Sequence, residues 1–154
     1  MGGIVKGCIT NPEVELPLNE FGKLDVSGAV GGSGELRVIR DLSLREPYVG
    51  RCELIDGEIA DDFANYFYTS EQQPSLVYLG VRVEPQQGTV RSAAGLIIAP
   101  LPDCPESDII RLEQLTGKIA KLSQHMDDGE TLESALNALF EGMEFEITDT
   151  LCPA

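Results

Sequence analysis

The sequence has little of what histidine-based or metal-based chemistry requires. It contains a single histidine, His125, and no tryptophan. Its cysteines stand far apart and form no Cys-x-x-Cys pair; they are Cys8, Cys52, Cys104 and Cys152. This pattern predicts reduced, individually unreactive thiols and argues against a zinc site or a Ser-His-Asp or Cys-His catalytic group. We expect His125 to be structural, at a helix C-terminus whose dipole favours a charged imidazole.

Positive charge is also scarce, since 11 Lys and Arg face 26 Asp and Glu, for a net charge of −15. Such a surface repels phosphate backbones and anionic membranes, so neither nucleic acid nor membrane is expected as a partner. No apolar run approaches the roughly 20 residues of a membrane helix, and the start Met1-Gly2-Gly3 lacks the pattern of a secretory signal. The sequence therefore predicts a cytoplasmic protein. The acidic excess is greatest in residues 103–154, with 12 acidic and 3 basic side chains.

The first two thirds of the chain are predicted to be rich in β-structure. Apolar runs, several of them alternating with polar residues, predict strands at 4–9, 24–26, 35–41, 48–55, 76–83 and 90–98. The glycine-rich segment 28–34 is expected to be a flexible turn, because the Lys-Ser/Thr of a phosphate-binding loop does not follow it. The last two strands form a hairpin, and the small residues Ala93, Ala94 and Gly95 favour a buried strand near the centre of the sheet.

One helix is predicted between these strands, over residues 57–67, from the apolar stripe Ile59, Phe63 and Phe67. Glu58, Asp61 and Asp62 fall in its first turns, where the helix dipole stabilises negative charge. The alternative is a metal-dependent hydrolase built from these carboxylates and Ser70, which we place in the following loop. An acidic helix end is the favoured interpretation.

The last third is predicted to be helical. Pro100-Leu101-Pro102 ends the strand region, and Asp103, Pro105 and Glu106 resemble a capping box at a helix start. Leucine, isoleucine and methionine at steps of three and four predict one face of a helix up to Met126, and Thr131 is expected to cap a second helix. The whole indicates an α+β fold: a mixed or antiparallel β-rich core piece with one packed helix, followed by a helical hairpin.

The apolar residues of this helix pair are called the seam below: Leu112, Leu115, Ile119, Leu122, Met126, Leu132, Leu136, Leu139 and Phe140. Such a stripe normally packs on its own domain, and periodicity alone favours that interpretation. It can also be covered conditionally and bind apolar segments of other chains.

A dense set of short motifs then gives the chain a family resemblance. The motifs include Gly22-Lys23-Leu24-Asp25-Val26, Arg40-Asp41-Leu42, Glu46-Pro47-Tyr48, Gly57 to Asp62, Ser70-Glu71-Gln72 with Pro74, Leu79-Gly80-Val81 and Ala94 to Ile98. From residue 3 to about 147 the sequence resembles the bacterial 33 kDa heat-shock chaperonin, a redox-regulated holding chaperone. The motif residues carried over are Gly22, Lys23, Asp25, Arg40, Asp41, Tyr48, Gly57, Glu58, Asp61, Ser70, Glu71, Gln72 and Pro74.

The resemblance implies an ATP-independent cytosolic chaperone, not an enzyme, that dimerises on oxidation and binds unfolding client proteins. It implies residues 1–102 as the later part of the core domain, 103–147 as a helical linker, and 148–154 as the start of a connection to a redox module. That module would hold zinc through Cys-x-Cys and Cys-x-x-Cys, which this sequence lacks, so we expect no cofactor in this chain. The family also has a helical and strand-forming stretch ahead of Gly3, so the chain is expected to be a middle piece.

Within the family the linker is conditional, which makes the seam the candidate client-binding surface, hidden at rest and exposed on activation. A third interpretation remains open, in which the piece is only a dimerisation or scaffold module. Strands left without neighbours would favour pairing with another chain, so oligomerisation is expected.

Overall fold

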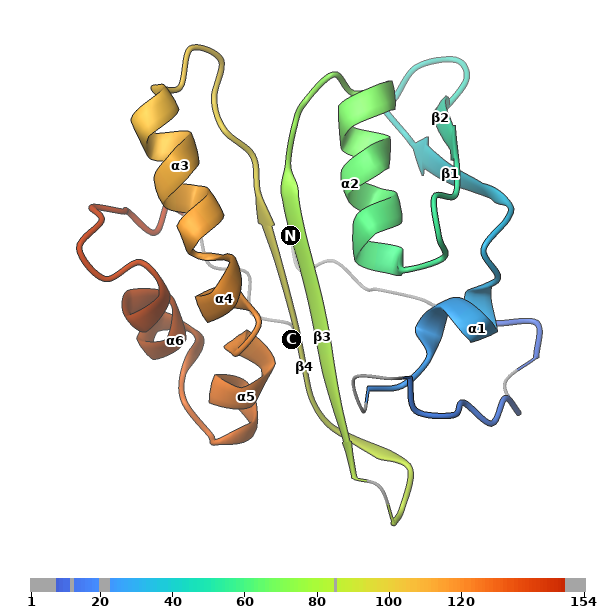
Figure 1. Ribbon diagram of the computed structural model, residues 1–154. Helices are drawn as coiled ribbons and strands as arrows, with labels where there is room; N and C mark the ends of the chain where they lie inside the picture. Colours follow the sequence, from blue (N-terminus) through green and yellow to red (C-terminus); the bar gives the residue numbers. More distant parts are fainter. Residues whose placement is uncertain (1–7, 12, 20–22, 85, 149–154) are drawn as a thin grey trace.

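The computed structural model describes residues 8–11, 13–19, 23–84 and 86–148, and its architecture is α+β (Figure 1). Within these residues the strands form two separate antiparallel hairpins. Helix α2 stands on one side of the long hairpin and the helices from α3 onward on the other. The expected fold class is confirmed. The strand predicted at 4–9 lies mainly outside the described residues, and Cys8 and Ile9 are not in a strand.

The first hairpin pairs β1 (Glu35–Arg40) with β2 (Tyr48–Glu53), with Glu35 opposite Glu53 and Arg40 opposite Tyr48. Both strands were predicted, but their pairing with each other was not. The segment predicted as a strand at 24–26 instead opens a short helix, α1 (Val26–Val30). The Asp25 carboxylate caps it by accepting hydrogen bonds from the Gly28 amide and the Ser27 hydroxyl, both at 3.0 Å. The strand prediction was wrong because three alternating residues favour a strand less strongly than an aspartate in the N-cap position favours a helix.

Helix α2 (Ile59–Ser70) follows the first hairpin and is longer than predicted, so Ser70 lies on the helix and not in a loop. The predicted stripe was also wrong in part, because Ile59 is 41% exposed while Asp62 and Tyr66 are each 2% exposed. Phe63 and Phe67 are half-buried and contact each other, with ring centroids 6.4 Å apart. Each of the two buried polar side chains makes a hydrogen bond, Asp62 through Oδ1 and Tyr66 through its hydroxyl, while Asp62 Oδ2 is buried without a partner among the described residues.

The second hairpin is long and pairs β3 (Leu76–Glu84) with β4 (Thr89–Ile98), with a register shift between Arg82 and Val83. The hairpin itself was predicted correctly. Its expected place at the centre of a sheet was wrong for the described residues, where no third strand pairs with it. Alternate residues of β4 are exposed, including Ala93 and Gly95, so one face of this hairpin is open.

The helical segment begins close to the predicted start of the first helix, but turns divide it into short helices. It consists of α3 (Glu106–Gln114), α4 (Thr116–Ile119) and α5 (Leu122–Asp127), followed by α6 (Leu132–Leu139). The breaks are tight turns in which the Leu115 amide donates to the Leu112 carbonyl and the Lys121 amide to the Lys118 carbonyl, both at 3.0 Å. One continuous heptad helix was therefore a wrong expectation.

The ends of these helices are partly as predicted. The Thr131 hydroxyl accepts a hydrogen bond from the Ser134 amide and caps α6, and α5 ends at Asp127 ahead of Gly129. The expected capping box at α3 is absent, because Pro105 occupies the N-cap and no side chain bonds to the first turn. Asp103 instead lies in a turn with φ of 65°.

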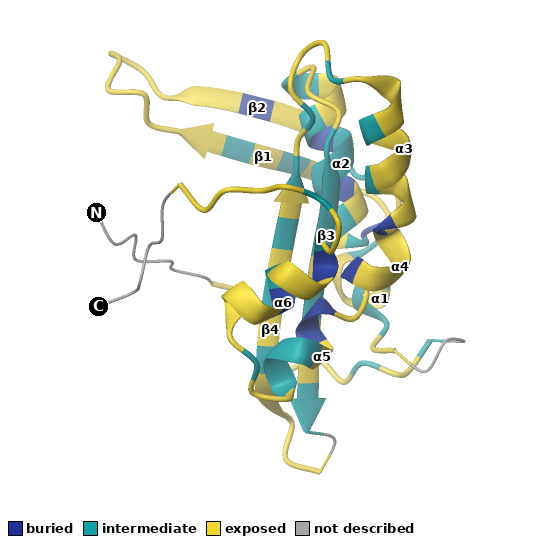
Figure 2. Ribbon diagram, turned by 90° about the vertical axis from the view of Figure 1, so that its left-hand side faces the viewer, coloured by how far each residue is buried: buried dark blue, intermediate teal, exposed yellow. Residues whose placement is uncertain are grey.

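The core is small and lies where α4, α5 and α6 face the long hairpin (Figure 2). Its buried apolar residues are Leu115, Ile119, Leu122, Ala135 and Leu139. The first hairpin is largely exposed in the same view. No helix among the described residues has the length and apolar character needed to cross a membrane.

Candidate functional site

The structure gathers much of the seam into one apolar cluster. Leu115, Ile119 and Leu139 form its buried centre, with Leu112 and Phe140 packed against them. Leu122 is also buried, at 2% exposed, and Met126 and Leu136 are half-buried. Leu132 is the exception at 54% exposed, since it begins α6 on the outer side. Sequence reasoning missed Ala135, which is 1% exposed and too small to stand out in an apolar stripe.

The opposite wall of this cluster is one face of the long hairpin. Leu76 and Tyr78 of β3 and Leu96 and Ile98 of β4 pack against the seam. These residues alternate along each strand, as residues on one face of a sheet must. The helices therefore cover one side of the hairpin, and lifting them off would expose the seam and this hairpin face together.

Polar contacts join the same two parts at the α5 side. The Tyr78 hydroxyl lies 3.2 Å from both the Ala120 carbonyl and the Ser123 hydroxyl, and the Ser92 hydroxyl donates to the Ser123 carbonyl at 2.9 Å. The Tyr78 ring reaches this position by crossing Gly80, where an added Cβ would overlap the Tyr78 hydroxyl. This contact therefore explains why position 80 is a glycine.

An ion-pair group stands beyond these hydroxyls, at the end of α5. The Asp127 carboxylate lies 3.2 Å from Arg82 Nε of β3 and 3.1 Å from Arg91 Nε of β4. Its side chain is 9% exposed, whereas the arginines are about half exposed. Sequence reasoning missed this group because its members are distant in the chain and carry no motif.

His125 lies in the last turn of α5 and contacts the segment that leads to α6. Its Nδ1 lies 2.9 Å from Glu130 Oε1, and the Ser134 hydroxyl donates to the other oxygen at 3.2 Å. The contact with His125, aided by Ser134, holds the pKa of the Glu130 carboxyl below its ordinary value. The histidine thus joins the two helices, which agrees with the structural role expected for it.

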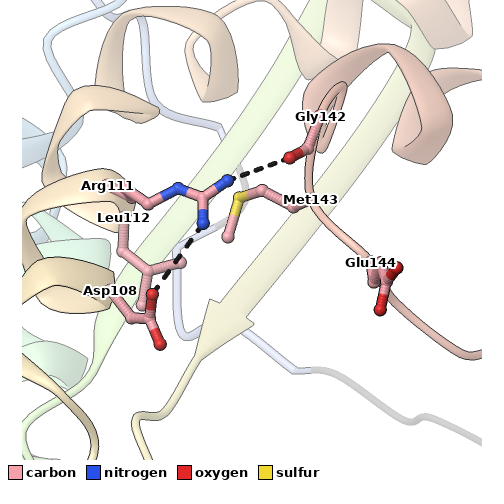
Figure 3. A pocket seen from close by; sticks show the side chains of 6 residues that line it. All are labelled: Asp108, Arg111, Leu112, Gly142, Met143 and Glu144. Carbon is pink, nitrogen blue, oxygen red and sulfur yellow. Dashed lines mark hydrogen bonds and ion pairs between the residues drawn. The ribbon is translucent and has the colours of Figure 1, made fainter.

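A shallow cavity of about 390 Å³ lies at the other end of the helical segment (Figure 3). Arg111 of α3 crosses it and donates to the Gly142 carbonyl at 2.9 Å, with Asp108 3.9 Å away. Met143 reaches from the segment after α6 into the apolar cluster. Arg111 therefore ties that segment to α3, and its guanidinium is already occupied by protein groups.

The motif residues around α2 form a second polar network. Arg40 Nη2 donates to both oxygens of the Glu71 carboxylate at 2.7 Å, and the buried Tyr66 hydroxyl donates to Oε1 of the same carboxylate at 2.5 Å. Burial and this hydrogen bond raise the pKa of Tyr66 to about 12, while the hydrogen bond from Tyr66 and the pairing with Arg40 lower the pKa of Glu71. The Arg40 guanidinium also lies 5.0 Å from the centre of the Tyr48 ring.

This network joins α2 to the first hairpin and needs a glycine on β2. A Cβ at Gly50 would overlap the Tyr66 hydroxyl. The Ser70 hydroxyl donates to the Arg51 carbonyl at 2.9 Å, which adds a contact at the end of α2. The motif residues Arg40, Tyr48, Ser70 and Glu71 are therefore explained by packing.

The other motif residues shape turns or lie on the surface. Asp41 accepts a hydrogen bond from the Ser43 amide at 2.9 Å. Gly57 has a φ of 81°, and a Cβ at this position would overlap the Gly31 carbonyl. Gln72 also has a positive φ, of 54°, and Pro74 is exposed. Lys23 is exposed, and Gly22 lies outside the described residues.

The carboxylates considered for a hydrolase do not converge on one site. Asp61 is exposed, and Asp62 is buried with one oxygen accepting from the Ile55 amide at 2.7 Å. The Ser70 hydroxyl donates its hydrogen bond to the Arg51 carbonyl, and the neighbouring Glu71 carboxylate is bonded to Arg40 and Tyr66. In the part of the chain that the structure describes, no group of three His, Cys, Asp or Glu side chains could hold a metal ion.

The cysteines likewise offer no zinc site. Cys8, Cys52 and Cys104 are free, and Cys152 lies outside the described residues. Burial, together with the charges of Asp62 and Glu35, raises the pKa of the Cys52 thiol, which keeps it protonated and weakly reactive. Among the described residues, the cysteines therefore do not provide the ligands for the zinc that the family resemblance implies.

The geometry is that of a binding protein in which apolar helices cover one face of a β-hairpin. A family model described as Hsp33 protein matches residues 1–152. The chain belongs to the Hsp33 family, a family of chaperonins and not of enzymes.

Similar proteins agree with this assignment. The chain is 48% identical over 149 residues to a 33 kDa chaperonin of Caldanaerobacter subterraneus subsp. tengcongensis, covering 97% of this chain and 50% of that protein. A 33 kDa chaperonin of Agathobacter rectalis is 49% identical over 148 residues, with coverage of 96% and 51%. The crystal structure of the 33 kDa chaperonin of Thermotoga maritima superposes with a TM-score of 0.68 at 36% identity, covering 89% of this chain and 46% of that one. The chain thus spans about half the length of the curated relatives it matches.

Proposed function

We propose that this chain contributes the client-binding surface of an ATP-independent holding chaperone, and that the seam is that surface. The observation that carries the proposal is the way the seam is covered. Leu115, Ile119, Leu122 and Leu139 are at most 7% exposed, yet they lie on short helical pieces resting on an apolar hairpin face.

Short helices make this cover dependent on its contacts. The pieces α4, α5 and α6 have 4, 6 and 8 residues. Isolated helices below about 12 to 15 residues are marginal in water, so tertiary packing supplies most of their stability. Once the packing is lost the pieces lose their helical structure too, and apolar side chains become available to an unfolding protein.

The charge of the same segment supports this role. Residues 103–154 carry 12 acidic and 3 basic side chains. Like charges on an opened segment keep it extended and oppose precipitation of its complexes with clients. An apolar surface flanked by acidic residues can thus hold a client without aggregating with it.

Family membership extends the proposal beyond this chain. We propose that the whole protein is cytoplasmic, that oxidation opens the helical cover, and that zinc is bound by parts of the relatives' length that this chain does not span. We also propose a homodimer, supported by the open face of the long hairpin, where Leu79, Val81 and Ile97 are 47%, 58% and 55% exposed. The domain limits expected at residues 102 and 147 belong to the same proposal.

The experiment compares seam variants with variants on the open hairpin face. The triple variant Leu112→Ser, Met126→Ser and Leu136→Ser changes half-buried seam residues. The matched control is the triple variant Leu79→Ser, Val81→Ser and Ile97→Ser on the open hairpin face. Light scattering of a thermally unfolding model protein is recorded without ATP, at stoichiometric ratio, with and without reductant. We expect the parent chain and the control to suppress scattering and the seam variant to lose suppression. Equal suppression by the seam variant would contradict the proposal, and loss only in the control would favour the dimerisation or scaffold role.

A further inference from the structure

We propose that Asp127, held between Arg82 and Arg91, is an electrostatic clasp that positions α5 on the long hairpin and keeps this end of the seam covered. The proposal rests on the proposed function only for the consequence of opening, since the contact itself is observed directly. It implies that ionic strength, as well as any thiol chemistry, changes how firmly α5 is held over the seam.

The clasp joins three elements through one side chain. Asp127 ends α5, Arg82 lies in β3 and Arg91 in β4, so its two oxygens bridge both strands of the hairpin at 3.2 and 3.1 Å. Glu84 is a further acidic neighbour, 3.8 Å from Arg91. The two arginines flank one carboxylate that is 9% exposed, but their own side chains are 45% and 53% exposed, so salt ions can reach both ion pairs.

The clasp lies at the end of the cover where the polar contacts gather. In the described part of the chain, side-chain hydrogen bonds between the helical segment and the hairpin involve Ala120, Ser123 and Asp127 and none of the residues of α3 or α6. The α3 and α6 ends are held by apolar contacts and by Arg111. Removing the charge of Asp127 should therefore loosen α5 and leave α2 unchanged.

The test measures amide hydrogen exchange along the full 154-residue chain. The variant Asp127→Asn is compared with Asp128→Asn, which changes the net charge equally at the next residue, an exposed side chain. At low salt we expect amides of α5 to exchange about tenfold faster in the first variant and within about twofold of the parent in the second. In about 1 M sodium chloride, where the screening length falls to about 3 Å, the parent should approach the Asp127→Asn variant.

Variants of the exposed partners keep the test independent of folding failure. Arg82→Gln and Arg91→Gln alter side chains that are 45% and 53% exposed, so neither should prevent folding. Each should raise α5 exchange, and the double variant Arg82→Gln with Asp127→Asn should fall short of the product of the single effects. Equal exchange in the Asp127 and Asp128 variants, or strictly multiplicative effects, would overturn the clasp.

Suppression of client aggregation is measured separately from the hydrogen exchange that tests the clasp. Faster α5 exchange without better suppression of client aggregation would leave the clasp standing and overturn the seam as the client-binding surface. Faster exchange together with suppression that no longer depends on salt would support both.

Discussion

Ile119 offers the sharpest test of the covered seam, because it is 1% exposed at the centre of the apolar cluster. The variant Ile119→Ala removes three carbon atoms, a loss of roughly 2.4 kcal/mol at about 0.8 kcal/mol each. The residual cavity between α4 and the hairpin raises the expected cost to about 3 kcal/mol, within the range of about 2 to 5 kcal/mol for such substitutions. A change of this size is a large fraction of the stability of a typical domain.

The control makes the same chemical change where there is no cavity to open. Ile109 lies in α3 and is 38% exposed, so Ile109→Ala should cost less than about 1 kcal/mol. Urea unfolding followed by circular dichroism gives the free energy of unfolding for both variants, and binding of an apolar dye reports exposure of the seam. We expect more dye bound to Ile119→Ala than to Ile109→Ala before global unfolding. Free energies within about 1 kcal/mol of each other would refute the reasoning that this residue holds the cover in place.

The remaining predictions concern the polar network around α2. Tyr66→Phe removes the hydroxyl from Glu71 and should lower the free energy of unfolding by about 1 to 3 kcal/mol, measured in urea. Because the pKa of Tyr66 is raised from 10.0 to about 12, its contribution is complete below pH 10 and is lost as the pH rises toward 12. An ultraviolet titration should show a late-ionising signal from Tyr66 that the variant lacks; its persistence in the variant would assign the signal to another residue. Gly50→Ala should lower the melting temperature because its Cβ overlaps the Tyr66 hydroxyl, and combining it with Tyr66→Phe should restore part of the loss. For Glu71 the lowered pKa means stability that is present above its ordinary value of 4.5 and lost as the pH falls through the lower value of the folded state. Glu71→Gln should therefore flatten the acid side of the stability curve, and an unchanged acid limb would contradict this.

The sequence by itself determined much of the local structure. Apolar runs and alternation predicted the four paired strands, and the short connection between β3 and β4 predicted the second hairpin, whereas the pairing of β1 with β2 was not predicted. The spacing of apolar residues also marked the seam, and Thr131 was recognisable as a helix cap because capping involves neighbouring residues. The motifs further predicted the family to which the chain belongs. Each of these features depends on residues close together in the sequence.

Tertiary structure decided which of those features are covered and how they are held. Periodicity placed Ile59 on the inner face of α2, but Asp62 and Tyr66 are buried instead, because the Ile55 amide and Glu71 lie where their polar groups can bond. The predicted long helix breaks at Leu115 and Lys121, where tight turns keep the chain against the hairpin.

The clasp of Asp127 with Arg82 and Arg91 joins residues 36 to 45 positions apart, and charges at such separations give no signal in a single sequence. Local spacing can specify an amphipathic stripe, but only the packed chain determines what lies opposite it. For this protein, that partner is the inner face of the long hairpin.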